Sequence, residues 1–305
     1  MALDELLPGR AFTVLGAAGF VGQRVVARLR EGAHMSQFTV LGASGYIGNR
    51  LVQHLQAQGH TVWAPARGDT SVLNRSLGHV LYCIGLTADF RERPFDTVDA
   101  HVTFLAQVLQ QAQFDSLLYL SSTRVYMGAV HTDEDALLTV QPSDPSYLYN
   151  LTKLTGESLC HSSQRIGVRV ARLSNVVGPD MDASSGNFIA SLLHAAHAGH
   201  VLLQSAPESA KDYVHIDDVV DWLPRITLGG QSSTYNVASS VQTAHAQWLD
   251  WLVKHTGCSC AVKPGAPMQY FLPINTQRLQ AEFGKKILPL ADWLINVKGK
   301  SWQIT

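Results

Sequence analysis

Tyr149 and Lys153 stand four residues apart, a spacing at which the two side chains can share acid–base chemistry. In a helix this spacing places both side chains on one face, one turn apart. A phenol with its ordinary pKa of about 10 is a poor base at neutral pH. A nearby ammonium favours the phenolate and lowers the pKa of the phenol, and the same lysine can hold a cofactor ribose. The alternative is a solvated helix face, so the surrounding motifs must decide.

Two copies of one glycine-rich pattern precede this pair, at residues 12–22 and 38–48. Each copy has the pattern of a buried strand, a tight turn and an amphipathic helix. Glycines in such a turn let the backbone approach the pyrophosphate of a dinucleotide, and the helix N-terminus offers free N–H groups. Only the second copy is followed by a further strand, at 61–64. The sequence therefore predicts a working loop made by Gly42, Gly45 and Gly48.

The choice between NAD and NADP depends on the residues that follow the strand at 61–64. An acidic residue there binds the ribose hydroxyls of NAD, whereas an arginine accepts the 2′-phosphate of NADP. This strand leads to Arg67 without an acidic residue at its tip. The pattern favours NADP, and the alternative is that Arg67 is a solvated loop residue.

The first glycine copy needs a different explanation. Residues 65–78 are too few for the further helix and strand of a doubly wound sheet. Our hypothesis is that a strand at 12–16 supplies a parallel edge strand beside 61–64. The glycine turn of that copy would then be a relic without a ligand.

Small and hydroxyl-bearing residues follow the next two strands, at 79–85 and 117–120. Ligands of such sheets lie at the carboxyl ends of the strands. We therefore expect Ile84, Gly85 and Thr87 to face the cofactor. The hydroxyl cluster at 121–123 follows the second strand at the same rim, although such clusters usually serve turns.

Composition excludes several other classes of protein. Lys plus Arg number 23 and Asp plus Glu 24, and no basic patch indicates binding to nucleic acid or an anionic membrane. The four cysteines show neither a disulfide framework nor a zinc spacing, so no metal is expected. No apolar run is long enough to span a membrane, and the N-terminus lacks the basic start of a secretory signal. The expected location is the cytoplasm.

Five motifs follow one another in the chain: the glycine turn at 42–48, LSSTRVY at 120–126, the Tyr149/Lys153 pair, RLSNVVGP at 172–179 and KDYVHIDD at 211–218. Together they resemble the extended short-chain dehydrogenase/reductase family, which comprises nucleotide-sugar epimerases, dehydratases and reductases. The resemblance covers residues 37–295.

The resemblance implies an α/β fold, a Rossmann-like doubly wound parallel sheet with a smaller C-terminal substrate lobe. Residues 1–34 would be an N-terminal extension that repeats the strand–turn–helix unit. Residues 35–178 would form the dinucleotide-binding domain, and 179–305 mainly the substrate lobe with returning Rossmann elements. In this last part we expect helices at 186–197, 248–255, 276–283 and 290–296, and strands at 201–203 and 235–237.

By the same resemblance, Tyr149 is the general acid/base and Lys153 holds the nicotinamide ribose and tunes Tyr149. Ser122 orients the hydroxyl or carbonyl of the substrate.

Four further residues would bind ligands if the resemblance holds. Tyr46 and Ile47 contact the pyrophosphate, and Asn175 contacts the nucleotide-sugar unless it only caps a turn. Lys211 stands where the family often has an arginine near the substrate diphosphate. We interpret the acidic pair at 217–218 as capping a helix at 219–223.

The chain also departs from the family pattern. The 4,6-dehydratases carry an Asp-Glu pair where Thr123 and Arg124 stand, which argues against dehydration, and His101 replaces a usual asparagine. The sequence thus predicts an NAD(P)-dependent epimerase or reductase acting on a small-molecule nucleotide-diphosphate sugar. The alternative is a non-catalytic NAD(P)-binding redox sensor or scaffold. The resemblance also implies a homodimer formed through helices near 97–113 and 146–162.

Overall fold

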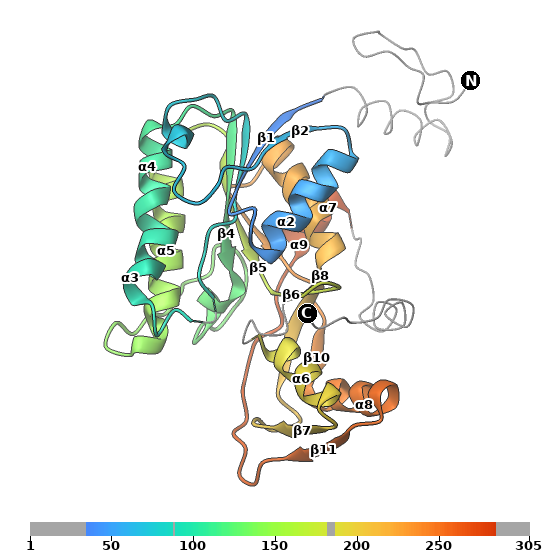
Figure 1. Cartoon of the computed structure of the whole chain (residues 1–305). Helices are drawn as coiled ribbons and strands as arrows, with labels where there is room; N and C mark the ends of the chain where they lie inside the picture. Colours follow the sequence, from blue (N-terminus) through green and yellow to red (C-terminus); the bar gives the residue numbers. More distant parts are fainter. Residues whose placement is uncertain (1–34, 88, 182–186, 285–305) are drawn as a thin grey trace, which may run out of the picture.

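The computed structural model describes residues 35–87, 89–181 and 187–284, and its centre is a six-stranded sheet (Figure 1). The order is β2-β1-β3-β4-β5-β9, with every neighbouring pair parallel. The bounds are β1 (Gln37–Leu41), β2 (Thr61–Trp63), β3 (His79–Tyr82), β4 (Ser116–Ser122), β5 (Val168–Leu173) and β9 (Thr234–Val237). This order confirms the predicted Rossmann-like fold. The predicted strand at 12–16 and helix at 290–296 lie outside the described residues.

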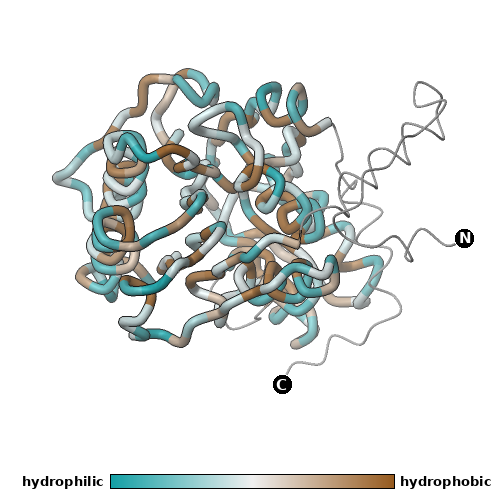
Figure 2. Tube along the Cα trace, turned by 90° about the horizontal axis from the view of Figure 1, so that it is seen from above, coloured by the Kyte–Doolittle hydropathy of each residue, from teal (hydrophilic) through white to brown (hydrophobic). Residues whose placement is uncertain are grey.

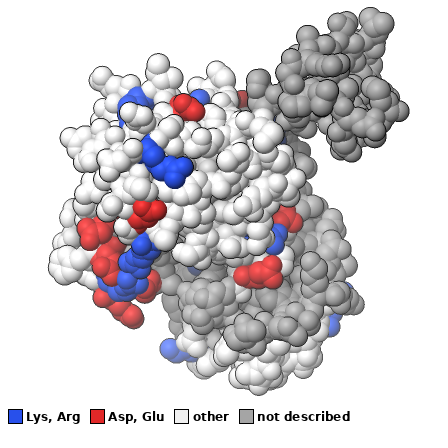
Figure 3. Space-filling view, turned by 45° about the horizontal axis from the view of Figure 1, so that its top comes forward, with Lys and Arg blue, Asp and Glu red and all other residues white. Residues whose placement is uncertain are grey.

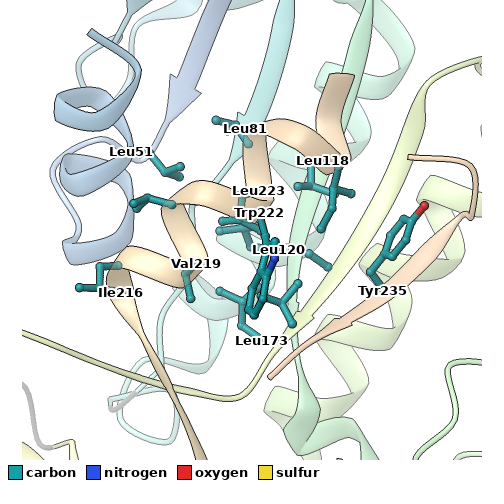
Figure 4. Packing of buried hydrophobic residues seen from close by; sticks show 14 of the residues in the cluster. Leu51, Leu81, Leu118, Leu120, Leu173, Ile216, Val219, Trp222, Leu223 and Tyr235 are labelled. Carbon is teal, nitrogen blue, oxygen red and sulfur yellow. The ribbon is translucent and has the colours of Figure 1, made fainter. Parts of the chain in front are cut away.

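Helices cover both faces of this sheet because its central strands are apolar on both sides. One face carries α2 (Tyr46–Ala57), α7 (Ile216–Gly229) and α9 (Gln277–Phe283), and the other carries α3 (Pro94–Val98), α4 (Phe104–Gln111) and α5 (Leu148–Ser162) (Figure 1). Each face has its own core. Trp222 and Leu223 of α7 pack with Leu118 of β4 on the first face (Figure 4). Leu105 of α4 and Tyr119 of β4 belong to the core of the second.

The helix predicted at 97–113 is a composite of three elements. It begins earlier, at Pro94, whose fixed φ suits a first helical turn. Between α3 and α4 the chain forms a turn of π-helix, η3 (Asp99–Thr103). Such turns are rare and often occur at functional sites. This one carries the buried His101.

The connection from β2 to β3 is as short as the sequence indicated. Residues 65–78 hold one 3-10 turn, η2 (Thr70–Leu73), capped by Asp69, and no strand. This connection passes over β1, because β3 pairs with the other edge of β1. All three strands stay parallel, but the strand order therefore switches from one side of β1 to the other between β2 and β3, and ligands of open parallel sheets bind at such a switch point.

The second lobe is built from short strands and two helices. It contains β6 (Asn175–Val177), β7 (His200–Leu203), β8 (Ala210–His215), β10 (Gln242–Ala244), β11 (Ser259–Val262), α6 (Phe188–His197) and α8 (His245–Thr256). The strands form two small sheets, β10-β8-β6 and β11-β7. Leu192, Tyr213, Trp248 and Leu252 belong to its separate core. Hydrophobic and hydrophilic residues alternate along the helices (Figure 2), as expected for helices with one buried face.

The interpretation of the acidic pair at 217–218 was wrong. Helix α7 begins at Ile216, and its N-cap is His215, whose ring accepts a hydrogen bond from the Asp217 N–H. Asp217 lies inside the first turn, where a carboxylate interacts favourably with the helix dipole. Its carboxylate also pairs with Arg50 of α2 at 2.8 Å.

The surface shows no large area of one charge sign on the face drawn in Figure 3, where acidic and basic side chains are intermingled. In the part of the chain that the structure describes, no helix is long and apolar enough to cross a membrane.

Gly156 sets the distance between α5 and β4. A Cβ atom at this position would lie 2.5 Å from the Tyr119 ring and hydroxyl and 2.9 Å from the His101 carbonyl oxygen. We expect Gly156→Ala to lower the free energy of unfolding by about 1–3 kcal/mol, because overpacking forces neighbouring groups to move. Urea unfolding of the purified variant measures this loss.

Gly229→Ala is the matched control, because Gly229 also lies in a helix but a Cβ there meets nothing within 4 Å. We expect it to leave stability unchanged or slightly increased. Equal stability of the two variants would contradict the close approach of α5.

Candidate active site

Tyr149 and Lys153 lie on one face of α5, as the spacing predicted, and this face is turned to the sheet. Their side chains are only 5% and 4% exposed. The Lys153 Nζ donates a hydrogen bond of 2.8 Å to the carbonyl oxygen of Leu120 near the end of β4. It lies 5.9 Å from the centre of the Tyr149 ring. The pair is therefore part of the protein interior rather than a solvated helix face.

The Tyr149 phenol meets two hydroxyl groups from different strand ends. Burial raises the pKa of Tyr149, while hydrogen bonding by Ser122 and Thr87 and the charge of Arg124 oppose that rise. The sequence predicted a lowering by Lys153 instead. The pKa of Tyr149 is instead raised, because the cost of desolvating the phenolate outweighs the effect of the neighbouring groups. Thr87, expected beside the cofactor, thus also lies against the catalytic candidate.

Burial also shifts the pKa of Lys153. Desolvation lowers its pKa from 10.5 to about 7, although the nearby Glu157 and Cys83 favour the charged form. The site therefore holds a lysine that exchanges a proton near neutral pH.

Glycines make the cradle at the ends of β1 and β3. Gly42 has a φ of +86°, and a Cβ there would lie 2.9 Å from the backbone of Cys83 and Ile84. A Cβ at Gly48 would lie 2.3 Å from the Gly42 carbonyl oxygen. The turn thus cannot accept larger residues, and the ends of β1 and β3 touch where the strand order switches sides.

The start of α2 offers free backbone donors beside this cradle. Gly45 is the N-cap and supplies no side-chain cap. The Tyr46 hydroxyl donates to the Pro179 carbonyl oxygen at 3.0 Å, and Ile47 packs on the core. Both side chains are thus engaged elsewhere, and these residues can reach a pyrophosphate through their N–H groups.

Two arginines lie near the end of β2. Arg67 is exposed in the turn that follows the strand. The Arg75 guanidinium stacks on the Trp63 ring at 4.0 Å, a contact that sequence reasoning missed because the two residues are twelve positions apart in an irregular segment.

His101 fills the space between the β3 end and α5. A Cβ on Gly85 would lie 3.2 Å from His101 Nε2 and 3.4 Å from Lys153 Nζ. His101 Nε2 accepts from the Leu86 N–H at 3.2 Å, which leaves the proton on Nδ1. Nδ1 lies 2.8 Å from the Thr152 hydroxyl, which donates to the Tyr149 carbonyl oxygen.

Burial and the charge of Lys153 hold the pKa of His101 at about 2. The ring therefore stays neutral and connects the β3 loop to the first turn of α5.

Two of the residues expected to bind substrate, Asn175 and Lys211, come from the second lobe. The Asn175 amide donates to the Asp212 carbonyl oxygen at 2.8 Å, so its side chain joins β6 to β8. Lys211 is half-buried, with its ammonium 4.6 Å from the centre of the Phe271 ring. Burial, together with the charge of Arg124, lowers the pKa of Lys211.

A buried ion pair supports the site from behind. Arg172 of β5 donates to Glu157 of α5 through Nη2 at 2.6 Å and through Nε at 3.0 Å. Ser121 of β4 donates to the same carboxylate, and Arg172 also donates to the Tyr126 hydroxyl at 2.8 Å. Because breaking a buried pair leaves an uncompensated charge, this network fixes α5 against β4 and β5.

Comparison with known proteins identifies the family. The model of the NAD dependent epimerase/dehydratase family matches residues 38–238. The chain belongs to this family. The match confirms the resemblance to extended short-chain dehydrogenases/reductases and, with it, the class of enzyme and its nicotinamide cofactor.

Individual relatives are distant. UDP-glucuronic acid decarboxylase 3 of Arabidopsis thaliana is 23% identical over 243 residues, which cover 76% of this chain and 70% of the relative. The structure of TunA, an NAD-dependent NDP-hexosamine 5,6-dehydratase, has a TM-score of 0.70 at 19% identity and covers 85% of this chain and 95% of its own. RMD from Pseudomonas aeruginosa, complexed with NADPH, has a TM-score of 0.69 at 20% identity, covering 85% and 97%. These two structures show the shared fold.

The lowered pKa of Lys153 makes stability depend on pH. The unfolded chain binds a proton at this residue up to a pKa of 10.5, whereas the folded chain releases it above about 7. The free energy of unfolding therefore rises with pH between these values, by at most about 1.4 kcal/mol per pH unit from this group. We expect Lys153→Met to flatten the rise between pH 7.5 and 9.

Urea unfolding of both proteins at several pH values in that range measures the two slopes. Histidines and tyrosines titrate mainly outside the range. Parallel slopes for the wild type and the variant would show that Lys153 keeps its ordinary pKa.

Proposed function

We propose that the protein is an NAD(P)-dependent epimerase or reductase acting on a nucleotide-diphosphate sugar. The observation that carries the proposal is the convergence of Ser122, Tyr149 and Lys153, from β4 and α5, beside a cradle that only glycines allow. A protein that only binds a dinucleotide needs the cradle but has no need of the buried phenol and its hydroxyl partners.

The residues present fit a dinucleotide. Gly42 and Gly48 leave room for the pyrophosphate, the N-terminus of α2 supplies N–H donors, and Gly85 brings the β3 loop close to Lys153. The Lys153 ammonium keeps donors for a ribose beyond its bond to Leu120. When bound, NAD(P) supplies a nicotinamide ring that accepts or donates a hydride.

The side chains divide the proton chemistry between them. Tyr149, in its phenolate form, takes the proton of a carbinol hydroxyl, and in the reverse direction its phenol returns the proton. Ser122 donates to the substrate oxygen as it becomes a carbonyl. Thr87 and Ser122 hydrogen-bond Tyr149, so a substrate oxygen would replace one of these contacts.

This chain lacks the Asp-Glu pair of the 4,6-dehydratases, since Thr123 and Arg124 stand at those positions. Lys211 and Asn175 of the second lobe are the candidates to hold the diphosphate and the nucleotide-sugar.

Tyr149→Phe tests the proposed chemistry. We expect turnover of a nucleotide-sugar substrate to fall by about 10² or more, because general acid–base catalysis contributes 10²–10⁴. Cofactor binding should persist, since the ring remains. Chromatographic separation of substrate and product measures turnover for either enzyme type, and fluorescence of bound NAD(P)H measures cofactor binding. Full turnover by the variant would overturn the assigned role.

Whether a nucleotide stays bound, and whether the protein prefers NADPH or NADH, decides between the two enzyme types. If the cofactor is retained through the cycle, as an epimerase requires, denaturing the purified protein should release stoichiometric nucleotide, which mass spectrometry identifies. A dissociable reductase should instead be purified empty and bind NADPH more tightly than NADH.

Our proposal for Arg67 is that it holds the 2′-phosphate of NADP. Arg67→Ala should then weaken the binding of NADPH by roughly 10-fold or more and leave the binding of NADH unchanged, because only NADPH carries that phosphate. Lys254→Ala, which removes an exposed cation of α8 in the other lobe, is the control. Equal effects of Arg67→Ala on both cofactors would contradict this role.

A further inference from the structure

Two arginines are arranged around Phe90 and Tyr149, and Lys211 lies within electrostatic range of one of them. The guanidinium groups of Arg91 and Arg124 lie 4.5 and 5.5 Å from the centre of the Phe90 ring. That ring is 5.6 Å from the Tyr149 ring, and the Arg124 guanidinium is itself 5.9 Å from the Tyr149 ring. Lys211 faces them from the second lobe, close enough to repel Arg124. Positive charge thus gathers at the residue proposed to react with substrate.

Arg124 is held in place by uncharged acceptors. Its Nε donates to the Asn150 side chain at 3.2 Å, and its Nη2 donates to the Ser146 carbonyl oxygen at 3.3 Å. Asn150, which is 0% exposed, donates back to the Arg124 carbonyl oxygen at 3.0 Å. A buried residue next to Tyr149 in sequence therefore positions both the side chain and the backbone of Arg124.

No carboxylate among the described residues forms an ion pair with Arg91, Arg124 or Lys211. Asp144 is near enough to attract both arginines, but its carboxylate accepts from the Ser146 N–H and hydroxyl. Burial and the charge of Arg91 lower the pKa of Arg124. An anion bound here would relieve this repulsion, because opposite charges attract strongly where water is excluded.

A diphosphate accounts for only part of this charge. Lys211, on the second lobe, is the proposed partner of the diphosphate. Arg124 is hydrogen-bonded to Asn150 in the first turn of α5 and lies beside Tyr149, the residue proposed to act on the sugar ring. Its planar guanidinium suits a carboxylate, which it can bind through two parallel hydrogen bonds.

We propose that Arg124, with Arg91 at the rim, binds a carboxylate carried by the sugar ring near the carbon at which Tyr149 acts. The preferred substrates would then be nucleotide-diphosphate sugar acids rather than neutral sugars. This inference rests on the proposed function and names the substrate class of that same site.

The test compares sugars that differ only at this substituent. Calorimetric titration of the protein loaded with reduced cofactor, which prevents oxidation, measures binding of UDP-glucuronate and UDP-glucose, and of the corresponding dTDP and GDP pairs. We expect the acid of at least one pair to bind about tenfold tighter or more, since a hydrogen bond to a charged group is worth roughly 10- to 100-fold. Equal binding within every pair, or no binding of any sugar, would overturn the proposal.

Variants separate the two anionic groups of the substrate. Arg124→Gln should remove the preference for the acid and leave the neutral sugar nearly unchanged, and Arg124→Lys should retain part of the preference. Lys211→Gln should weaken the binding of both sugars alike, because both carry the diphosphate. Arg225→Gln, on the outer face of α7 and paired with Asp221, is the control for loss of a cation. An equal loss of both sugars in Arg124→Gln would assign Arg124 to the diphosphate instead.

Failure of this inference is distinguishable from failure of the proposed function. Fluorescence of bound NAD(P)H in the same samples and Tyr149-dependent turnover test the function, and neither requires an acidic substituent. Intact cofactor binding and turnover without a preference for the acid would overturn only the subsite.

Discussion

The close approach of α5 to the carboxyl half of β4 is the constraint on which the site depends. Gly156 permits this approach, and the Glu157–Arg172 pair makes it costly to lose. Once the helix is fixed, Tyr149 must lie beside Ser122, and the Lys153 ammonium must reach the Leu120 carbonyl oxygen. The catalytic candidates are thus placed by packing between one helix and one strand, not by a flexible loop.

Burial has a different consequence for each ionisable group in this region. It raises the pKa of Tyr149 and lowers the pKa values of Lys153 and His101, because in each case the charged form is the one that loses water. The site of the free protein is therefore poised with a protonated phenol and a lysine near its own pKa. Ligands that bring charge or exclude further water will act on that balance.

The two lobes contribute different kinds of interaction. The Rossmann lobe supplies backbone donors at the start of α2, a glycine cradle and the buried acid–base pair. The second lobe supplies Lys211 on an aromatic surface, and Arg124 faces it from the first lobe. Under the proposed function, substrate recognition would thus be electrostatic and lie between elements far apart in the chain, whereas cofactor recognition would depend on local backbone geometry.

The sequence by itself determined the features that depend on short-range pattern. Strand–turn–helix periodicity predicted the parallel sheet and, in the second lobe, the helices α6 and α8 and the strand β7, but not β6, β8, β10 or β11. Glycine spacing predicted the tight turn after β1, where a Cβ at Gly42 or Gly48 would meet backbone atoms at 2.9 Å or less. The four-residue spacing placed Tyr149 and Lys153 on one helical face.

Only the tertiary structure decided which groups surround that pair. Thr87 joins Ser122 at the Tyr149 hydroxyl, His101 reaches Thr152 from 51 positions away, and Asn150 holds Arg124. These partners come together because parallel strands bring distant loops to one edge of the sheet. The sign of the Tyr149 pKa shift was also beyond the sequence, since it depends on how much water the folded protein excludes.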